Sequence, residues 1–484
     1  MVWRIARAGV RALTASAIVL YACAAVAAQS AAREPEAALL ARTAQLMHAG
    51  RLDAARDAAQ QAVAAYPDSA RAHDQLGFVL GLQGATDEAI AEFRRAIALQ
   101  PALADAQYHL GATLWWTKQF DAARAPLERA VALRPAHAES RYYRGLVRKQ
   151  LGDLPGAVGD LRAAVRADPG LAAAHMQLGV ALQEYGDIDG AIAALETAVK
   201  LDPSRADAGN SLGLALINKG EAERAVATLR RVVEQHPEFG SARLNLGTAL
   251  LQNGDLDGAV REYRDLTQRE PKNAEAFYDL GLALKQQDAF EPAESALREA
   301  MRLDASMPEA PFTLGVVLWQ TGRAEEAVPL FREALSRRPE YAEAHYMLGT
   351  IFKQQGNTEA ALKEFHATVR INASSAEAYT SIGQTLNARG DRAGAAAAFA
   401  EADRLNKIKA DSQAAIFAVN AGLSLMKQGR VAAAIDKFRG AARLAPENAQ
   451  AHYQLALALR RAGRLREARS EFATAMRLAP YLRR

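Results

Sequence analysis

Histidines are the side chains of this sequence best suited to metal binding or acid–base chemistry, and there are 9 of them. Four could ligate one metal ion if the fold brought them together: His73, His175, His345 and His452. The first three are separated by whole multiples of 34 residues, which places them at the same position in different copies of a repeated unit. Because such copies lie far apart, we expect no metal site.

Other catalytic constellations are not evident in the sequence. Asp and Glu pairs are frequent, but they fall mostly on positions that we expect to face solvent. Glycines recur singly and form no phosphate-binding loop. The single cysteine, Cys23, lies in an N-terminal segment that we expect to be removed, so we expect no disulfide, catalytic thiol or cysteine-bound metal. We therefore predict no enzyme activity and no cofactor.

The elements that position these residues follow from a 34-residue period that returns thirteen times. One copy has the template Leu76-Gly77, Ala89, Phe93, Ala96 and Pro101. One period later the chain has Leu110-Gly111, Ala123, Leu127, Ala130 and Pro135. The register holds from residue 36 to 409, skips five residues at 410–414, and resumes from 415 to 482.

Each copy contains two runs of apolar residues at helical spacing, which predicts a pair of helices. A glycine such as Gly84 separates the two runs in most copies, where a left-handed residue would end the first helix. A proline such as Pro101 stops the second helix. One pair cannot bury its apolar face alone, so we expect neighbouring pairs to stack into a continuous core.

This pattern resembles the tetratricopeptide repeat (TPR) family over residues 36–482. The resemblance implies an all-α fold, an α-solenoid of antiparallel helix pairs that forms a right-handed superhelix with a concave groove. It further implies eleven tandem repeats at 36–409, an insertion at 410–414 and two more repeats at 415–482. The sequence departs from the family pattern where Ala305 and Ala373 replace the terminal proline. In the insertion, we expect a lengthened helix or a loop.

In the family, the first helix of each pair lines the groove, chiefly through positions 2, 5, 9, 12 and 13 of the repeat. The resemblance therefore places a set of aromatic residues and lysines in a protein-binding groove. Aromatic side chains are enriched at binding hot spots, although tyrosines at position 5 could equally pack between helices. The predicted groove residues are Tyr108, Trp115, Trp116, Tyr142, Lys149, Tyr278, Lys285, Phe312, Trp319, Tyr346 and Lys353.

Glutamates at position 2 and glutamines at position 13 would complete this lining. An acidic edge opposite amides and lysines could pair with an extended peptide. The same side chains could also be an ordinary hydrophilic surface. The position 2 glutamates are Glu275, Glu309, Glu343 and Glu377.

The first 28 residues have the layout of a secretory signal peptide. Arg4, Arg7 and Arg11 precede a stretch without charge that ends in Ala27-Ala28, where we expect cleavage, and residues 29–35 would be a short linker. The alternatives are an uncleaved inner-membrane anchor at 12–28 or lipidation of Cys23. These would be the chain's only means of contacting a membrane.

Charge argues against a nucleic-acid partner. The formal net charge is +4, and three of the positive charges lie in the segment expected to be removed. Basic and acidic residues are interspersed along the remainder of the chain.

From the sequence we expect a bacterial, periplasmic or secreted, non-enzymatic scaffold that binds protein or extended peptide segments. One alternative is a self-associating assembly or transport adaptor of an envelope complex, and another is a regulatory subunit for a catalytic partner on another chain. Fold alone does not choose among these functions.

Overall fold

The computed structural model describes residues 34–480, so the predicted signal peptide lies outside the described residues. Within 34–480, all regular elements are helices and none is a strand. The prediction of an all-α solenoid built from helix pairs is confirmed. The chain divides into two compact units, residues 1–181 and 182–484. The handedness of the superhelix stays a prediction.

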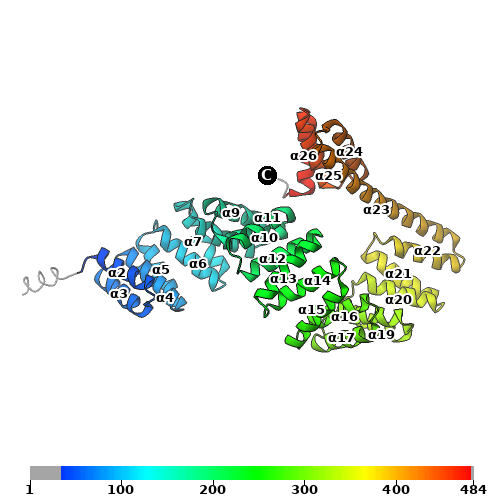
Figure 1. The fold of residues 1–484 in the computed structure, drawn as a ribbon, viewed down its shortest axis with the longest axis horizontal. Coiled ribbons are helices and arrows are strands. Elements are labelled where there is room, and N and C mark those ends of the chain that lie inside the picture. The colour runs from blue at the N-terminus through cyan, green and yellow to red at the C-terminus, as the bar shows by residue number, and fades with distance from the viewer. Residues whose placement is uncertain (1–33, 481–484) are drawn as a thin grey trace, which may run out of the picture. The chain divides into compact units, whose positions relative to one another are not determined.

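The first unit contains four helix pairs and most of a further helix, α10, which runs into the second unit (Figure 1). Its helices are α2 (Glu36–His48), α3 (Leu52–Ala65), α4 (Ala70–Leu82), α5 (Thr86–Leu99), α6 (Ala104–Trp116), α7 (Phe120–Leu133), α8 (Ala138–Gln150), α9 (Leu154–Ala167) and α10 (Ala172–Tyr185).

The second unit continues the same alternation of first and second helices up to α22 and ends in a different arrangement around α23. Its helices are α11 (Ile188–Leu201), α12 (Ala206–Lys219), α13 (Ala222–Gln235), α14 (Gly240–Gln252), α15 (Leu256–Arg269), α16 (Ala274–Gln286), α17 (Phe290–Leu303), α18 (Glu309–Gln320), α19 (Ala324–Arg337), α20 (Ala342–Gln354), α21 (Thr358–Ile371), α22 (Ala376–Ala388), α23 (Arg392–Lys427), α24 (Val431–Leu444), α25 (Ala449–Arg461) and α26 (Leu465–Leu478).

Small residues let the two helices of a pair approach closely. A Cβ added to Gly213 of α12 would lie 2.3 Å from Cγ of Leu229 in α13, closer than real Cβ contacts. Leu229 is fully buried, as are its equivalents in the neighbouring pairs. The glycine inside the first helix is therefore required by packing, despite its low helix propensity.

The turn within each pair requires a left-handed residue. Gly84 has φ +81°, and most pairs have a glycine with positive φ at this point. Lys118 and Asp288 occupy the same turn in two other pairs and adopt φ of 60° and 56°. A side chain in this region is disfavoured, so these two turns are strained relative to the glycine turns.

The junctions that lack the terminal proline are closed by side-chain hydrogen bonds. The backbone N–H of Ser306 donates to Oδ1 of Asp304 at 2.8 Å. Ser374 makes the same contact with Asn372 at 3.1 Å. Helices α17 and α21 end in the same register as helices followed by proline, so proline is not needed to end the second helix.

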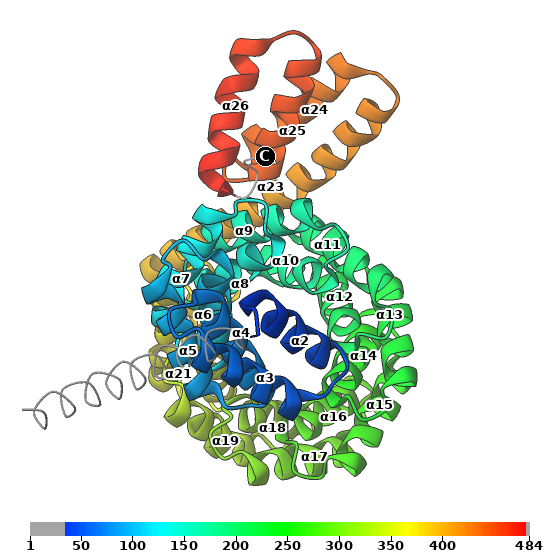
Figure 2. The same cartoon turned by 90° about the vertical axis from the view of Figure 1, so that its left-hand side faces the viewer.

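Within the second unit, consecutive pairs follow an arc. Figure 2 shows first helices α12, α14, α16 and α18 on the inner side of this arc and second helices α13, α15, α17 and α19 on the outer side. The first helices thus form the inner surface over this part of the chain, as the family resemblance implied.

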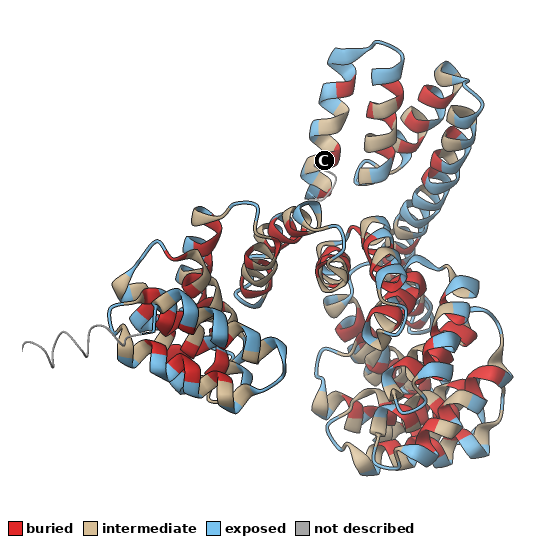
Figure 3. Ribbon diagram, turned by 60° about the vertical axis from the view of Figure 1, so that its left-hand side comes forward, coloured by how far each residue is buried: buried red, intermediate tan, exposed pale blue. Residues whose placement is uncertain are grey.

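The insertion makes one continuous helix, α23, of 36 residues. It joins the second helix of one repeat to the first helix of the next, so the lengthened helix is observed and the loop is not. These two segments cannot pack side by side because they belong to one rod. Figure 3 shows the exposed residues along this helix. No helix within residues 34–480, α23 included, is long and apolar enough to cross a membrane.

The exposure of two phenylalanines on α23 shows that the stacking of helix pairs is interrupted there. Phe399 is 36% exposed, whereas Phe365, one period earlier, is fully buried. Phe417 is 74% exposed at a position that is a buried alanine in most repeats, such as Ala378 and Ala451. A phenylalanine at this position would not fit against a preceding pair.

Candidate binding surfaces

Neighbouring first helices are connected by a ladder of side-chain contacts between residues 35 apart. Position 5 of one repeat meets position 6 of the next. Nδ2 of Asn245 donates to Oδ1 of Asn210 at 2.8 Å, and the Tyr346 hydroxyl lies 3.4 Å from Oγ of Ser381. Tyr346 therefore has a structural role in the ladder, whatever else it contacts.

Helices α6 and α8 carry an aromatic cluster that includes four predicted groove residues. The ring of Trp115 lies 4.9 Å from the Trp116 ring and 5.7 Å from the Tyr143 ring, in edge-on geometry. Tyr108 lies 5.9 Å from Tyr143, and Tyr142 stacks edge-on against Tyr143 at 5.1 Å. Tyr143 is the centre of this aromatic cluster, which we define by these five residues.

Sequence reasoning did not single out Tyr143. It occupies position 6 directly after the predicted groove residue Tyr142. Tyr143 could have been identified from its spacing of 35 residues to Tyr108, because the ladder joins residues at that spacing.

The two tryptophans of the aromatic cluster differ in exposure. Trp116 is 67% exposed, and its Nε1–H donates to the hydroxyl of Tyr143 at 3.1 Å. Trp115 is partly buried against the apolar core, and its Nε1 is buried without a hydrogen-bond partner. Burial also raises the pKa of the Tyr108 hydroxyl. Trp116 thus presents a tethered ring to solvent, while Trp115 packs directly against it and Tyr108 packs against Tyr143.

Helices α18 and α20 place two other predicted groove residues around a hollow. Phe312 and Tyr346 line a cavity of about 310 Å³ with Met347 and Ala342. The Phe312 ring also packs against Tyr341 at 4.7 Å. The remaining lining residues are Glu343, Thr368, Asn372, Ser375 and Glu377. We call this the α18–α22 hollow.

Three further predicted groove residues of the second unit contact neighbouring first helices. Nε1 of Trp319 donates to Oε1 of Gln354 at 3.3 Å, and Nζ of Lys353 donates to Gln384. Burial raises the pKa of Tyr278, and a hydrogen bond with Thr313 opposes that rise. Lys285 is partly exposed on α16, as Lys149 is on α8 in the first unit. Whether these residues bind a ligand stays a prediction.

The ladder is incomplete at Asp279 of α16. Its position 5 counterpart, 35 residues earlier, is Leu244, which offers no hydrogen bond. Burial, assisted by the nearby charge of Glu275, raises the pKa of Asp279 to about 7. The carboxyl is therefore partly protonated near neutral pH.

Three of the four histidines considered as metal ligands contact a glutamate within their own repeat, whereas Nε2 of His175 contacts the carbonyl oxygen of Pro169 at 3.1 Å. Nδ1 of His345 lies 2.6 Å from the Glu364 carboxylate, and His452 makes the same contact with Glu471 at 2.6 Å. His73 pairs with Glu92. Each pair joins residues 19 apart, a spacing that the sequence contains but that was not used in prediction. No cluster of three or more His, Cys, Asp or Glu suited to a metal occurs within residues 34–480.

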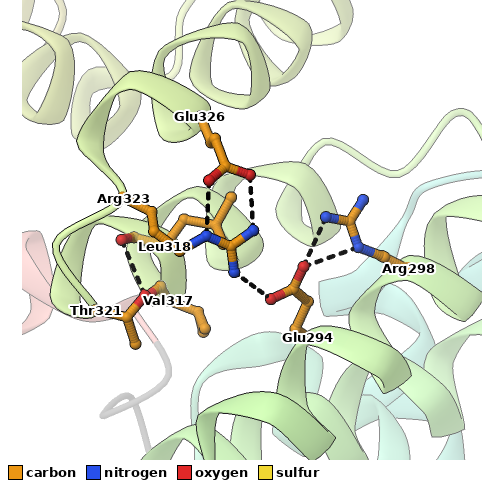
Figure 4. Close-up of polar contacts among 7 residues, drawn as sticks. All are labelled: Glu294, Arg298, Val317, Leu318, Thr321, Arg323 and Glu326. Carbon is orange, nitrogen blue, oxygen red and sulfur yellow. Dashed lines mark hydrogen bonds and ion pairs between the residues drawn. The ribbon is translucent and has the colours of Figure 1, made fainter.

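Charged side chains around the turns and outer helices pair with one another. Arg323 bonds both Glu326 and Glu294 at 2.7 and 2.8 Å, and Arg298 bonds Glu294 at 2.7 Å (Figure 4). The hydrogen bond from Arg298 is the largest cause of the lowered pKa of Glu294. These charged side chains are paired within the protein, and each exposed pair contributes little to stability.

Family models match along nearly all of the described chain. Models described as tetratricopeptide repeats match residues 37–69, 114–172, 176–238, 210–263, 244–308, 312–374, 346–415 and 419–482, and a TPR repeat model matches 82–115. The chain belongs to the tetratricopeptide repeat family.

Several solved structures resemble parts of the chain. MamA is 27% identical and covers 34% of this chain and 96% of its own, with a TM-score of 0.32. YrrB, described as a TPR protein with an unusual peptide-binding site, is 22% identical over 39% of this chain and 96% of its own, with a TM-score of 0.35. PilF of Pseudomonas aeruginosa is 20% identical over 43% and 94%, with a TM-score of 0.38. No curated protein matches the sequence.

Proposed function

We propose that this TPR protein is an exported, non-enzymatic scaffold that binds extended segments of other proteins on the surface formed by its first helices. The observation that carries the proposal is the tethered, exposed ring of Trp116. Tryptophan and tyrosine side chains are enriched at binding hot spots, and Trp116 lies among other aromatic rings of the cluster. A ring already held in place loses little conformational entropy on binding.

The first helices of the second unit supply a separate set of contact groups. In the second unit they form the inner side of the arc, where an extended segment could contact several repeats at once. Their amides, hydroxyls and aromatic rings suit a peptide backbone and its side chains.

The binding part of this proposal is tested by capture from an envelope extract. Trp115→Ala combined with Trp116→Ala should release proteins that the wild-type chain retains, because the exposed ring and its support are both lost. Replacement of Phe417, an exposed aromatic on α23, by alanine is the matched control and should retain them. If the double variant holds every partner as tightly as the wild type does, the aromatic cluster is not the binding surface.

The export part rests on the charge layout of residues 1–28, which is typical of a signal peptide. N-terminal sequencing of the protein purified from its native cells should begin just after Ala27 or Ala28. A chain from the cytoplasmic fraction that still begins at Met1 would contradict export.

A further inference from the structure

The α18–α22 hollow combines an apolar wall with free negative charge. Its wall is formed by Phe312, Tyr346 and Met347. Two exposed glutamates, Glu343 and Glu377, border it at position 2 of consecutive repeats. Neither carboxylate makes a hydrogen bond or an ion pair with any residue in 34–480. The hollow therefore offers two unneutralised acceptors beside an apolar surface.

The equivalent glutamate one repeat earlier is paired. Glu309, also at position 2, accepts a hydrogen bond from Arg338, the residue just after α19. The residues 29 further along from Glu343 and Glu377 are Asn372 and Asn406, which carry no positive charge. Because asparagine stands at both positions that correspond to Arg338, the carboxylates of Glu343 and Glu377 have no arginine to pair with.

The polar side chains inside the hollow are already used by the protein. Oγ of Ser375 accepts the backbone N–H of Ala378, and Oδ1 of Asn372 accepts from Ser374. The Thr368 hydroxyl donates to the carbonyl oxygen of Glu364 at 3.1 Å. Recognition by this hollow would therefore depend on its apolar wall and its two carboxylates.

We infer that the α18–α22 hollow binds a lysine or arginine side chain of an extended peptide. The aliphatic stem of such a side chain would pack on Phe312, Tyr346 and Met347, and its cationic head would reach Glu343 and Glu377. The aromatic walls favour a nearby cation as well. A cavity of about 310 Å³ has room for one long side chain. The inference rests on the proposed function, since it specifies the chemistry of a peptide ligand.

The test begins with a random ten-residue peptide library displayed on phage and selected on the full chain. Enriched peptides should share a lysine or arginine at one aligned position. The best arginine peptide is then synthesised together with its citrulline analogue, which keeps the shape and loses the charge. Fluorescence anisotropy should show about tenfold weaker binding of the citrulline peptide, as expected for loss of a charge-assisted hydrogen bond.

The protein side of the test is Glu343→Gln combined with Glu377→Gln. Both residues are exposed, so the fold should remain intact. The double variant should bind the arginine and citrulline peptides equally, about tenfold more weakly than the wild type binds the arginine peptide. Glu359→Gln is the control, because Glu359 is an exposed residue of the same repeat outside the hollow, and it should keep the preference.

The outcomes separate the inference from the function on which it rests. Peptides that enrich without a basic preference, or a preference that survives in the double variant, would overturn the inference and leave peptide binding intact. If no peptide enriches on the wild-type chain, the proposed function fails and the inference fails with it.

Discussion

The aromatic cluster of the first unit and the α18–α22 hollow of the second use similar residues at the same repeat positions. They differ in how much space remains between the rings and in whether the polar groups have partners. In the cluster, Tyr143 contacts Tyr108, Trp115 and Trp116 and accepts the Trp116 hydrogen bond. In the hollow, Phe312 and Tyr346 leave a cavity, and the glutamates beside it have no partner. Repeat position alone therefore does not decide whether a side chain packs internally or faces a ligand.

The difference arises from the residues of the following repeat. Position 6 of the next repeat is Tyr143 beside the cluster, a large ring that fills space and accepts a hydrogen bond. Beside Tyr346 it is Ser381, whose small side chain reaches the tyrosine hydroxyl and fills little volume. The following predictions test whether satisfied and unsatisfied groups along the first helices behave differently.

The largest effect is expected at Asp279, where the ladder lacks a partner. Its folded-state pKa of about 7 lies above the ordinary value of 3.8, so the folded chain holds the proton more tightly than the unfolded chain does. Stability from this group is thus lost as pH rises from about 4 through 7. Asp279→Asn should remove the loss and stabilise α16 by up to about 4 kcal/mol at pH 8, with little change at pH 4.

Hydrogen exchange of α16 at several pH values measures this effect directly, because local opening energies can differ along a solenoid. Asp57→Asn, at an exposed position of α3, is the control and should leave exchange unchanged. A wild-type α16 whose protection increases between pH 4 and 7 would contradict the assignment.

Replacing one aromatic ring in each region by alanine should show how tightly that ring is packed, because a tightly packed ring contributes more to local stability. Tyr108 packs against the core cluster of the first unit, so Tyr108→Ala should cost about 3 kcal/mol of local stability in α6. Phe312 already borders a cavity, so Phe312→Ala should cost α18 less, about 1–2 kcal/mol. Protection factors from hydrogen exchange give both values. Equal losses would mean that the hollow is packed as tightly as the cluster.

The hydrogen bond that holds the Trp116 ring can be removed while the aromatic ring of Tyr143 stays in place. Tyr143→Phe deletes the hydroxyl that accepts the indole N–H, a contact worth about 1 kcal/mol. We expect the Trp116 ring to become more mobile, with lower tryptophan fluorescence anisotropy, and captured partners to bind about three- to fivefold more weakly. Phe417→Ala, which lies outside the aromatic cluster, is the control and should leave binding unchanged. Unchanged binding in Tyr143→Phe would show that this hydrogen bond does not order the Trp116 ring for binding.

The smallest effect is expected at the two turns that lack glycine. Lys118→Gly in the first unit and Asp288→Gly in the second should each stabilise their helix pair by about 0.5–1 kcal/mol, since glycine adopts positive φ without a steric penalty. Gly84→Ala should do the reverse. Local exchange of α6–α7 and α16–α17 reports the changes, and destabilisation by either glycine would mean that the replaced side chain contributes a contact.

The fold could be predicted in detail because the residues that determine it recur with a 34-residue period. Gly77, Ala89 and Phe93 recur at fixed spacing, and each recurrence marks the same helix contact. The sequence does not determine the conformation of the insertion, since a missing proline is compatible with either a loop or a continuous helix. Phe417 at a position that is alanine in most repeats was the unused signal that the stacking is interrupted there.

The candidate surfaces were harder to predict because they depend on pairs of residues and on unfilled volume. The 35-residue ladder could have been predicted from the sequence by assuming that neighbouring first helices touch, and the 19-residue His–Glu contacts by assuming that the two helices of one repeat touch. A hollow such as the one beside Phe312 and Tyr346 depends on several side-chain volumes at once. The repeat template does not contain that information.

Site-specific photocrosslinking in native cells tests the central claim, binding by the first helices, most directly. A photoreactive amino acid would replace Trp116 or Met347 on first helices, and Arg129 or Arg332 on exposed sites of second helices. We predict that the first-helix positions capture defined, extended segments of the same proteins, identified by mass spectrometry of the crosslinked peptides. Capture mainly from the second-helix positions would contradict the account.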